Sequence, residues 1–349
     1  MSPSAVLYSG PRDVAAVTLD TPPPGQNQVQ IAVAYTGICG TDLHIYHGDM
    51  DSRVHPPGII GHEMSGTIAV LGANVSGWSV GDRVTVMPLD WCGECPACAV
   101  GHTHICHNLT FIGIDSTGAM QSRWNVHVRT LVRLPNELDL SHAALVEPTA
   151  VAVHDVRRAA LTAGERVVVV GAGPVGVLIG LVAARFGADV LILDLDEYRL
   201  DVATKVGLRA AIPDAGLQPH INAWTGGAGA NVAFEVSGSA DGVSTAVESL
   251  AVRGRLIQVG IHAAPREVNL HRFFWRELEL LGARLYQRDD FEEAVCLVSE
   301  GAIPADQLIS RIEPMESAPD AFAALERADG VMKILIDCTP GTAVHGSAS

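Results

Sequence analysis

Four consecutive valines, Val167–Val170, lead directly into a cluster of glycines, and this segment restricts the possible folds more than any other part of the chain. Gly171, Gly173 and Gly176 have the spacing G-x-G-x-x-G, and a helix-like apolar pattern follows them. By hydropathy alone, the uncharged run from 167 to 184 is long enough to be flagged as a membrane span. Its glycines favour instead a buried strand, a tight turn and a buried helix.

From about residue 150 onward, apolar runs that end in glycine alternate with helical patterns, as in RVVVVGAG, PVGVLIGLVAARFG and ADVLILDLD. This alternation predicts an α/β fold with a doubly wound parallel sheet, covered by helices on both faces. The first third of the chain carries short β runs such as QVQIAVAY at 28–35, which predict a compact, barrel-like β-rich domain. Periodicity alone does not assign the tail from about residue 289, which ends in the strand-like run MKILIDC, to either domain.

The order of strand, glycine turn and helix is the context in which G-x-G-x-x-G binds a dinucleotide. The glycines permit the tight turn, the approach of a pyrophosphate and the packing of helix on strand, so the phosphates would sit at the helix N-terminus. Asp194 ends the next strand, and no Arg or Lys follows it before Arg199. A carboxylate there accepts hydrogen bonds from the ribose hydroxyls and repels a 2′-phosphate, which favours NAD over NADP. The alternative is a glycine turn in an α/β protein that binds no nucleotide, and the register of strand, helix and acid disfavours it.

Composition excludes several classes of protein. The 349 residues are 48% hydrophobic and 18% charged, which predicts a globular chain. With 23 Lys+Arg against 39 Asp+Glu, a net charge of −16 and no basic stripe, we expect no nucleic-acid partner. The segment MSPSAVLYSGPRD lacks a basic region followed by an apolar stretch, so we expect a cytoplasmic protein without membrane association.

Four of the seven cysteines lie within fifteen positions: Cys92, Cys95, Cys98 and Cys106. Four thiolates at this spacing can close a tetrahedron around Zn²⁺ with no open position, which predicts a structural zinc. An iron–sulfur cluster and a redox pair are the alternatives. The neighbouring histidines are rival ligands, namely His102, His104 and His107. We prefer Cys106 as the fourth ligand because it keeps one ligand type.

A second group of metal-ligand residues is more dispersed: Cys39 in GICGTDLH, His62 and Glu63 in GHE, and Glu147 in VEPTA. Taken singly, each is more often a core or surface residue. Together they form the mixed ligand set, with one position free, that a catalytic zinc requires. Such a zinc would acidify a bound alcohol, and an alkoxide expels hydride more readily than an alcohol does.

Two residues near Cys39 are candidates for a proton relay. The hydroxyl of Thr41 could take the alcohol proton, and His44 could release it to solvent because imidazole titrates near neutral pH. The alternatives are a turn residue for Thr41 and a solvated helix position for His44.

These motifs together resemble the zinc-dependent medium-chain dehydrogenase family: GICGTDLH, GHE, the four-cysteine lobe, EPTAVAVH, GAGPVG, LILD, EVSG and GVMKILID. The resemblance implies a split GroES-like catalytic domain of residues 1–150 and 286–349 around a Rossmann NAD-binding domain of residues 151–285. It also implies a catalytic zinc held by Cys39 and His62, with Glu63 or Glu147 completing the shell. Glu147 and VEPTAVAVHDVRRA are similar to the sorbitol-type branch, whereas CGTDLHIYHGD resembles the threonine and butanediol enzymes.

The resemblance extends to further site residues. Besides the glycines and Asp194, we expect cofactor contacts at Pro174, Val175, Arg199, Ser237, Val259 and Ile261. The residues expected to line the substrate pocket are Tyr46, Phe111, Glu147 and Tyr286. Leu285 departs from some sorbitol-type enzymes, which have an arginine there, and this disfavours strict specificity for sorbitol.

The expected activity is NAD-dependent oxidation of a secondary alcohol in a polyol or diol to the ketone, with one catalytic and one structural zinc per chain. Buried partners for a neighbouring hydroxyl would disfavour simple monoalcohols. A threonine or butanediol dehydrogenase activity is the alternative within the family, and a non-catalytic nucleotide-binding protein is the alternative outside it. We also expect a homo-oligomer, either a dimer or a tetramer.

Overall fold

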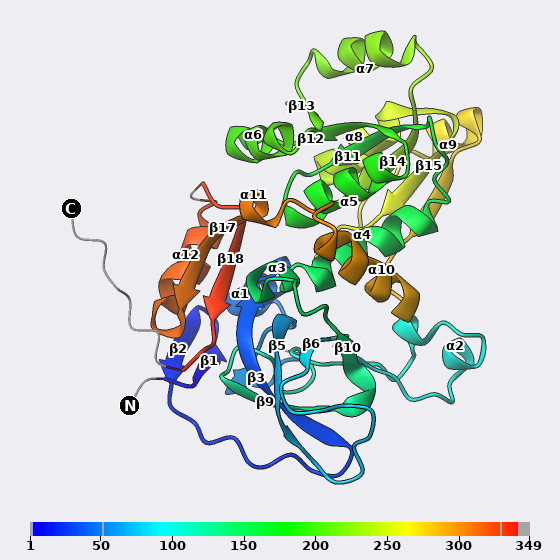
Figure 1. The fold of residues 1–349 in the computed structure, drawn as a ribbon. Coiled ribbons are helices and arrows are strands. Elements are labelled where there is room, and N and C mark those ends of the chain that lie inside the picture. The colour runs from blue at the N-terminus through cyan, green and yellow to red at the C-terminus, as the bar shows by residue number, and fades with distance from the viewer. Residues whose placement is uncertain (1–2, 51, 329, 341–349) are drawn as a thin grey trace, which may run out of the picture. The chain divides into compact units, whose positions relative to one another are not determined.

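The computed structural model describes residues 3–50, 52–328 and 330–340, and the chain divides into two compact units (Figure 1). Unit 1 comprises residues 1–147, 295–301 and 309–349, and unit 2 comprises residues 148–294 and 302–308. The first predicted boundary, 150/151, lies close to the observed one, whereas the second, 285/286, lies before the observed change at 294/295. Residues 341–349 of the predicted catalytic domain lie outside the described residues.

The second boundary differs because the helix α10 (Arg288–Ser299) belongs to both units. Its first half is tied into unit 2, where Asp290 accepts a 2.6 Å hydrogen bond from Arg157 and lies 2.8 Å from Nδ1 of His154. Phe291 packs there against Tyr286, with ring centroids 5.2 Å apart. Sequence periodicity shows where the helix lies but not that its two halves pack in different units.

Unit 2 is built on a six-stranded parallel sheet of order β13-β12-β11-β14-β15-β16, which confirms the predicted doubly wound α/β fold. The strands are β11 (Arg166–Val170), β12 (Asp189–Leu193), β13 (Arg209–Ala211), β14 (Ala230–Glu235), β15 (Leu250–Gln258) and β16 (Glu279–Gly282). The helices assigned to this unit are α5 (Pro174–Arg185), α6 (Glu197–Lys205), α7 (Leu217–Thr225), α8 (Ala240–Ser249), α9 (Leu270–Arg276) and α11 (Ala305–Leu308). Chain order reverses between β11 and β14, so the loops after these two strands diverge at the switch point of the sheet.

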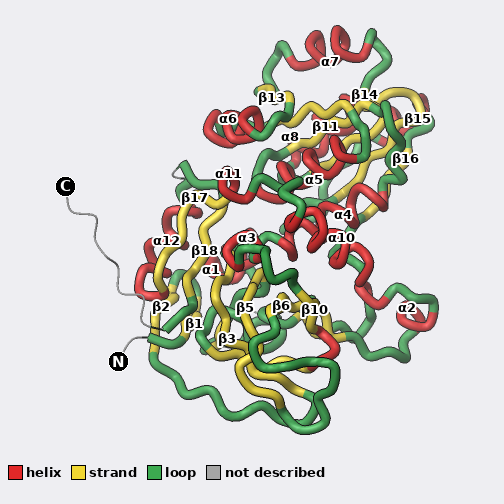
Figure 2. The backbone as a smooth tube through the Cα atoms, viewed as in Figure 1, coloured by secondary structure: helices red, strands yellow, loops and turns green. Residues whose placement is uncertain are grey.

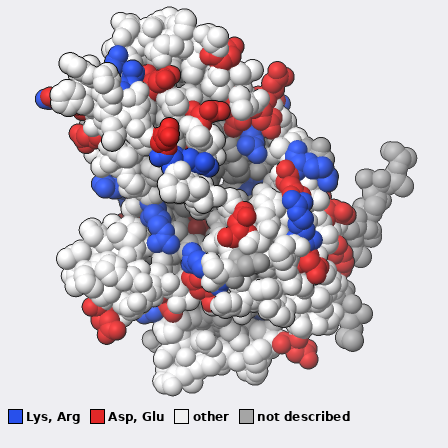
Figure 3. Space-filling model, turned by 180° about the vertical axis from the view of Figure 1, so that it is seen from behind, with Lys and Arg blue, Asp and Glu red and all other residues white. Residues whose placement is uncertain are grey.

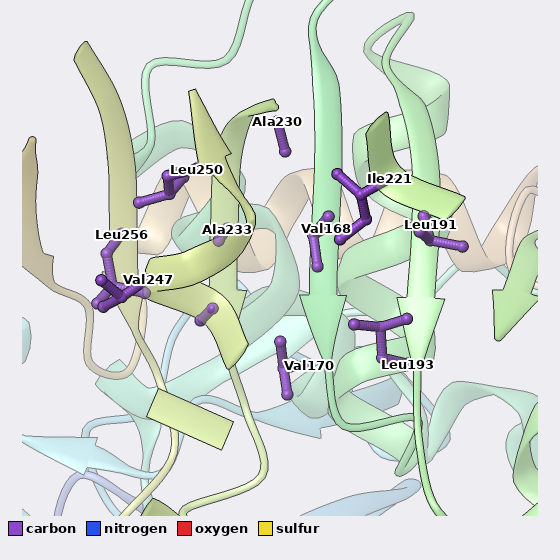
Figure 4. Packing of buried hydrophobic residues seen from close by; sticks show 11 residues of the cluster. Val168, Val170, Leu191, Leu193, Ile221, Ala230, Ala233, Val247, Leu250 and Leu256 are labelled. Carbon is purple, nitrogen blue, oxygen red and sulfur yellow. The ribbon is translucent and has the colours of Figure 1, made fainter. Parts of the chain in front are cut away.

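A buried aliphatic cluster holds this sheet to its helices (Figure 4). Alternate residues of β11 and β12 contribute Val168, Val170, Leu191 and Leu193, and Val247 of α8 packs into the same cluster. Both faces of a central parallel strand are buried, which is why the four valines are contiguous rather than alternating with polar residues.

The described residues of unit 1 form three sheets, and the largest has seven strands, in the order β10-β6-β5-β3-β18-β17 with β9 also paired to β3. These strands are β3 (Gln28–Gly37), β5 (Glu63–Leu71), β6 (Arg83–Val86), β9 (Arg123–His127), β10 (Leu131–Arg133), β17 (Ile309–Pro314) and β18 (Lys333–Asp337). The smaller sheets are formed by β1 (Ala5–Gly10), β2 (Asp13–Val17) and β4 (Gly58–Ile59), and by β7 (Leu89–Asp90) and β8 (Thr110–Phe111). The C-terminal tail thus joins unit 1, because β18 pairs antiparallel with β3.

The helical segments of unit 1 are short. They are α1 (Gly40–His47), α2 (Pro96–Ala99), η1 (Thr103–Ile105), η2 (Val128–Thr130), α3 (Leu140–Ala143), η3 (Met315–Ser317) and α12 (Ala318–Glu326). The helix α4 (Val146–Arg158) begins in the last two residues of the first segment of unit 1 and continues into unit 2. Figure 2 shows α2 in a loop-rich lobe rather than among the strands of the seven-stranded sheet.

Lys and Arg side chains are interspersed with Asp and Glu side chains on the face of the molecule shown in Figure 3. Among the described residues, no helix is both long and apolar enough to cross a bilayer. The apolar run from 167 to 184 is divided between β11, a glycine turn and α5, as the glycines predict.

Candidate functional site

Strand pairing brings Cys39, His62 and Glu63 together in unit 1. Cys39 follows β3 and caps α1, while His62 immediately precedes β5, and Gly37 of β3 is the register partner of Glu63. One potential ligand atom from each of the three residues lies within 4.8 Å of the others. His62 and Glu63 are 2% and 1% exposed, and a Cβ at Gly37 would overlap the Glu63 carboxylate.

Asp42 contacts both Cys39 and His62. Its Oδ2 accepts a 2.8 Å hydrogen bond from the Cys39 amide, and its Oδ1 lies 3.8 Å from Nδ1 of His62. Burial raises the pKa of Asp42. Burial lowers the pKa of His62, but Asp42 and Cys39 outweigh it and raise that pKa to about 10. A carboxylate behind a ligating histidine fixes the ring, and this contact favours Nε2 as the ligand atom.

Lys333, the first residue of β18, is a site residue that the sequence analysis missed. Its side chain is 2% exposed, its Nζ is ion-paired with Glu63 Oε2, and it donates a 3.0 Å hydrogen bond to the carbonyl of Ile38. Burial lowers the pKa of Lys333, but Glu63 and Cys39 outweigh it and raise that pKa above its usual value. The sequence clue was one lysine at the start of the apolar run ILI, where a buried strand was expected.

The donor set fits a zinc ion. Thiolate, imidazole and carboxylate are the ligands that catalytic zinc uses, with one position left open. Buried Nδ1 of His62 and Oδ1 of Asp42 have no hydrogen-bond partner, as expected for a pair that becomes ordered when His62 ligates a metal. Glu147, in the first turn of α4, is buried and acts electrostatically on both His62 and Lys333, although it is not in the group within 4.8 Å.

The other residues predicted around the metal differ in position. The Thr41 amide donates a hydrogen bond to Cys39 Sγ at 3.5 Å. Nδ1 of His44 lies 3.5 Å from Asp49, and the His44 side chain is 43% exposed. Phe111 is buried and meets the His62 ring edge-on, at 5.1 Å between centroids. Tyr46, by contrast, packs in the core of unit 1 against Phe322, 5.3 Å away.

Tyr286, the fourth predicted pocket residue, is fully buried in unit 2, where it packs against Phe291. For both tyrosines the structure thus offers a packing role, and substrate contact stays a prediction without structural support. Neighbouring Leu285 adopts a positive φ of 59°.

The four cysteines of the lobe form the second group whose ligand atoms lie within 4.8 Å of one another. Cys106 Sγ is 3.4 Å from Cys92 Sγ and 3.8 Å from Cys95 Sγ. Hydrogen bonds from the backbone amides of Cys98 and His107 lower the pKa of Cys95 to about 6, whereas burial and the neighbouring thiols raise that of Cys98 to about 12. Amides directed at sulfur favour thiolates, and a dication would let all four ionise together. The rival histidines are not in this group.

The glycine turn has the geometry that a pyrophosphate requires. Gly171 has a φ of +110°, a Cβ at Gly173 would meet no atom within 4 Å, and a Cβ at Gly176 would overlap the carbonyl of Gly171. Gly173 caps α5 without a side-chain hydrogen bond, and Pro174 and Val175 open the helix, so no capping side chain occupies its N-terminus.

Asp194 follows β12 beside this turn. Its carboxylate accepts hydrogen bonds from the amides of Ala172 at 2.6 Å and Asp196 at 3.0 Å. Nη1 of Arg199 lies 3.8 Å from Asp194 Oδ2, so the acid and the first following cation are neighbours in space. Ser237 follows β14, and Val259 and Ile261 follow β15, so all three lie in loops at the carboxyl ends of the parallel strands.

Comparisons with known proteins identify the family. A family profile described as "Alcohol dehydrogenase GroES-like domain" matches residues 25–136, and one described as "Zinc-binding dehydrogenase" matches residues 174–300. The 2-dehydro-3-deoxy-L-galactonate 5-dehydrogenase of Pseudoalteromonas atlantica is 45% identical over 335 residues, which are 96% of this chain and 98% of that protein. The chain belongs to the zinc-dependent medium-chain dehydrogenase family.

Two further members are also similar to this dehydrogenase. The sorbitol dehydrogenase of Halalkalibacterium halodurans is 32% identical, over 90% of this chain and 93% of that protein. The crystal structure of 2R,3R-butanediol dehydrogenase from Bacillus subtilis matches with a TM-score of 0.88 at 30% identity, over 96% of this chain and 99% of that one. The protein is therefore an alcohol or polyol dehydrogenase that uses zinc and a nicotinamide cofactor, and the predicted GroES-like and Rossmann folds are confirmed.

Proposed function

We propose that this dehydrogenase oxidises a secondary alcohol of a hydroxylated sugar acid to the ketone, with NAD as the hydride acceptor. The observation that carries the proposal is the group of partly buried Cys39 and buried His62 and Glu63, whose ligand atoms lie within 4.8 Å of one another. Asp42 and Lys333 contact this group. The sugar-acid substrate is supported by the 45% identical relative, whose name specifies a galactonate oxidised at carbon 5.

Zinc held by Cys39, His62 and a glutamate, Glu63 or Glu147, would act as a Lewis acid that makes the substrate hydroxyl more acidic. The chain's own residues prepare that chemistry. Asp42 orients the His62 ring, and Lys333 balances the buried charge of Glu63. The ring of Phe111 covers one side of the imidazole.

Oxidation transfers a hydride from carbon to NAD and leaves the hydroxyl proton to be removed. Thr41 Oγ1 is the proposed first acceptor, since Thr41 lies in the first turn of the helix that Cys39 caps. His44 is the proposed exit, because it lies in the same helix with its ring partly exposed beside Asp49. The balanced reaction yields the ketone, NADH and one proton.

The preference for NAD over NADP rests on Asp194. Its carboxylate lies between the glycine turn and α6, where a 2′-phosphate would meet negative charge. Arg199 lies beside it and would soften that repulsion. We therefore propose a preference for NAD rather than absolute exclusion of NADP.

The four-cysteine lobe is proposed to hold a second, structural zinc. We also propose a homo-oligomer, for which the edge strand β16 and the adjacent α9 offer a surface in unit 2. Phe274, Trp275 and Leu280 are 76%, 68% and 50% exposed there.

Initial rates with NAD and NADP on one substrate panel test the proposal: 2-dehydro-3-deoxy-L-galactonate, L-galactonate, sorbitol, xylitol, inositol, threonine and 2,3-butanediol. We expect the highest kcat/KM for a galactonate-type acid with NAD. A polyol such as sorbitol is the second candidate, favoured by the 32% identical relative, and a diol is favoured by the butanediol enzyme. A kcat/KM for sorbitol or butanediol about tenfold above that for the acids would replace the proposed substrate class.

A further inference from the structure

Glu235, the last residue of β14, connects the loops that follow β14 and β15 at the carboxyl ends of the unit 2 strands. It is fully buried. Its carbonyl accepts hydrogen bonds from the amides of Val259 at 3.0 Å and Gly260 at 2.8 Å. Its carboxylate accepts four more, from Ser237 Oγ at 2.6 Å, Gly238 N at 3.0 Å, Gln258 Nε2 at 2.7 Å and His262 Nε2 at 3.1 Å. One residue thus binds both the loop after β14 and the loop after β15.

The tautomer of His262 is set by its second partner. Arg266 Nε donates a hydrogen bond to His262 Nδ1 at 3.2 Å, so the ring proton lies on Nε2 and is donated to Glu235. Four donors converge on a carboxylate in a site that excludes water, where charge-assisted hydrogen bonds are strong and a missing acceptor is costly.

The two loops are also in direct backbone contact. A Cβ added to Gly260 would lie 2.6 Å from the amide nitrogen of Gly238 and 2.8 Å from Glu235 Oε2. A Cβ added to Gly238, whose φ is +67°, would lie 2.7 Å from the carbonyl of Ile261. Only glycine fits at these positions while the loops are held together.

This pair of loops lies at the switch point of the sheet. The amide of Val236 bonds the carbonyl of Val170 at 2.9 Å, and a Cβ at Gly171 would lie 3.0 Å from the amide nitrogen of Ser237. A doubly wound sheet binds one mononucleotide on each side of its switch point. Asp194 after β12 marks the adenosine side, so the loops after β14 and β15 belong to the nicotinamide side.

We propose that Glu235 is a positioning residue for the nicotinamide half of the cofactor. Its carboxylate holds the loops 236–239 and 259–262 as one wall, and His262, anchored by Arg266, holds the carboxylate from the far side. Without that acceptor the loops separate, and the nicotinamide end loses its wall while the adenosine end keeps Asp194. The inference rests on the dinucleotide site proposed above.

Binding of NADH and of ADP-ribose, which lacks the nicotinamide ring, tests this directly. By titration calorimetry we expect Glu235→Gln to weaken NADH about tenfold and ADP-ribose by no more than about twofold. Equal weakening of both ligands would mean a general structural role, and unchanged NADH affinity would mean no role; either result overturns the proposal. If the parent protein does not bind ADP-ribose, the dinucleotide site itself is wrong, which is a separate failure.

Two further variants keep the test decisive should Glu235→Gln fold poorly. His262→Ala removes one donor from a partly exposed position, and Gly260→Ala forces the loops apart without changing charge; both should weaken NADH selectively. Glu165→Gln is the matched control. Glu165 forms an ion pair with Arg255 of β15, and its carboxylate accepts a 2.8 Å hydrogen bond from the Thr162 amide. Glu165 directly precedes β11, so it lies at the amino ends of the strands, away from the two loops. It should leave both affinities unchanged.

Discussion

Replacing Lys333 with methionine keeps a long unbranched side chain but removes the charge that faces Glu63. The Lys333 and Glu63 side chains are 2% and 1% exposed, so the carboxylate would lose its counter-ion in a place that water does not reach. Breaking a buried ion pair in this way costs about 3–5 kcal/mol. We therefore expect metal-free Lys333→Met to lose about that much of its free energy of unfolding, measured by denaturant titration of chelator-treated protein.

The same variant should be partly rescued by zinc. A cation bound by Cys39 and His62 would restore positive charge beside Glu63, so the difference from the parent should shrink when zinc is added. Lys333→Arg keeps the charge and serves as the control. A loss below about 1 kcal/mol in the metal-free variant would refute the reasoning, because that is the value of an exposed pair.

Three further predictions concern other charged or metal-ligating groups. Burial, reinforced by Asp290, raises the pKa of Asp155 well above its usual value, so the folded state holds a proton that the unfolded state releases; stability is therefore lost as pH rises above the unfolded pKa, by up to ~1.4 kcal/mol per pH unit. Asp155→Asn should gain stability relative to the parent as the pH rises above the unfolded pKa of the aspartate, and parallel stability curves for the two proteins would contradict this. Asp194→Ala should raise the ratio of kcat/KM for NADP to that for NAD, and an unchanged ratio would place the ribose acid elsewhere. Cys95→Ser should lower the bound zinc by about one per chain and make the lobe susceptible to limited proteolysis, since structural zinc contributes roughly 10 kcal/mol in small peptides; full retention of zinc would refute the four-thiolate site.

The sequence is most informative where the residues of a site lie close together in the chain. The glycine turn and the four-cysteine lobe each lie within one short segment, so the spacing of the residues alone indicates the geometry. Cys39 and His62 are farther apart in the chain. Their residue types and the family resemblance predict a shared site, and the pairing of β3 with β5 brings the two residues together.

Local sequence patterns do not show the position of a residue when that position depends on the pairing of strands far apart in the chain. Lys333 reaches Glu63 only because β18 lies beside β3, which no local pattern specifies. The packing of Tyr46 against Phe322, which is far away in the chain, is likewise not indicated by any local pattern. Glu235 was passed over because a glutamate that ends a buried strand resembles any other strand terminus until its four donors are located.

Zinc content of the parent and of Cys39→Ser, measured by mass spectrometry beside turnover and NADH binding, tests the central claim most directly. We expect about two zinc ions per parent chain and about one in the variant, with turnover lost and NADH binding kept. Near-normal turnover in Cys39→Ser, or about one zinc per parent chain, would contradict a catalytic zinc at this site.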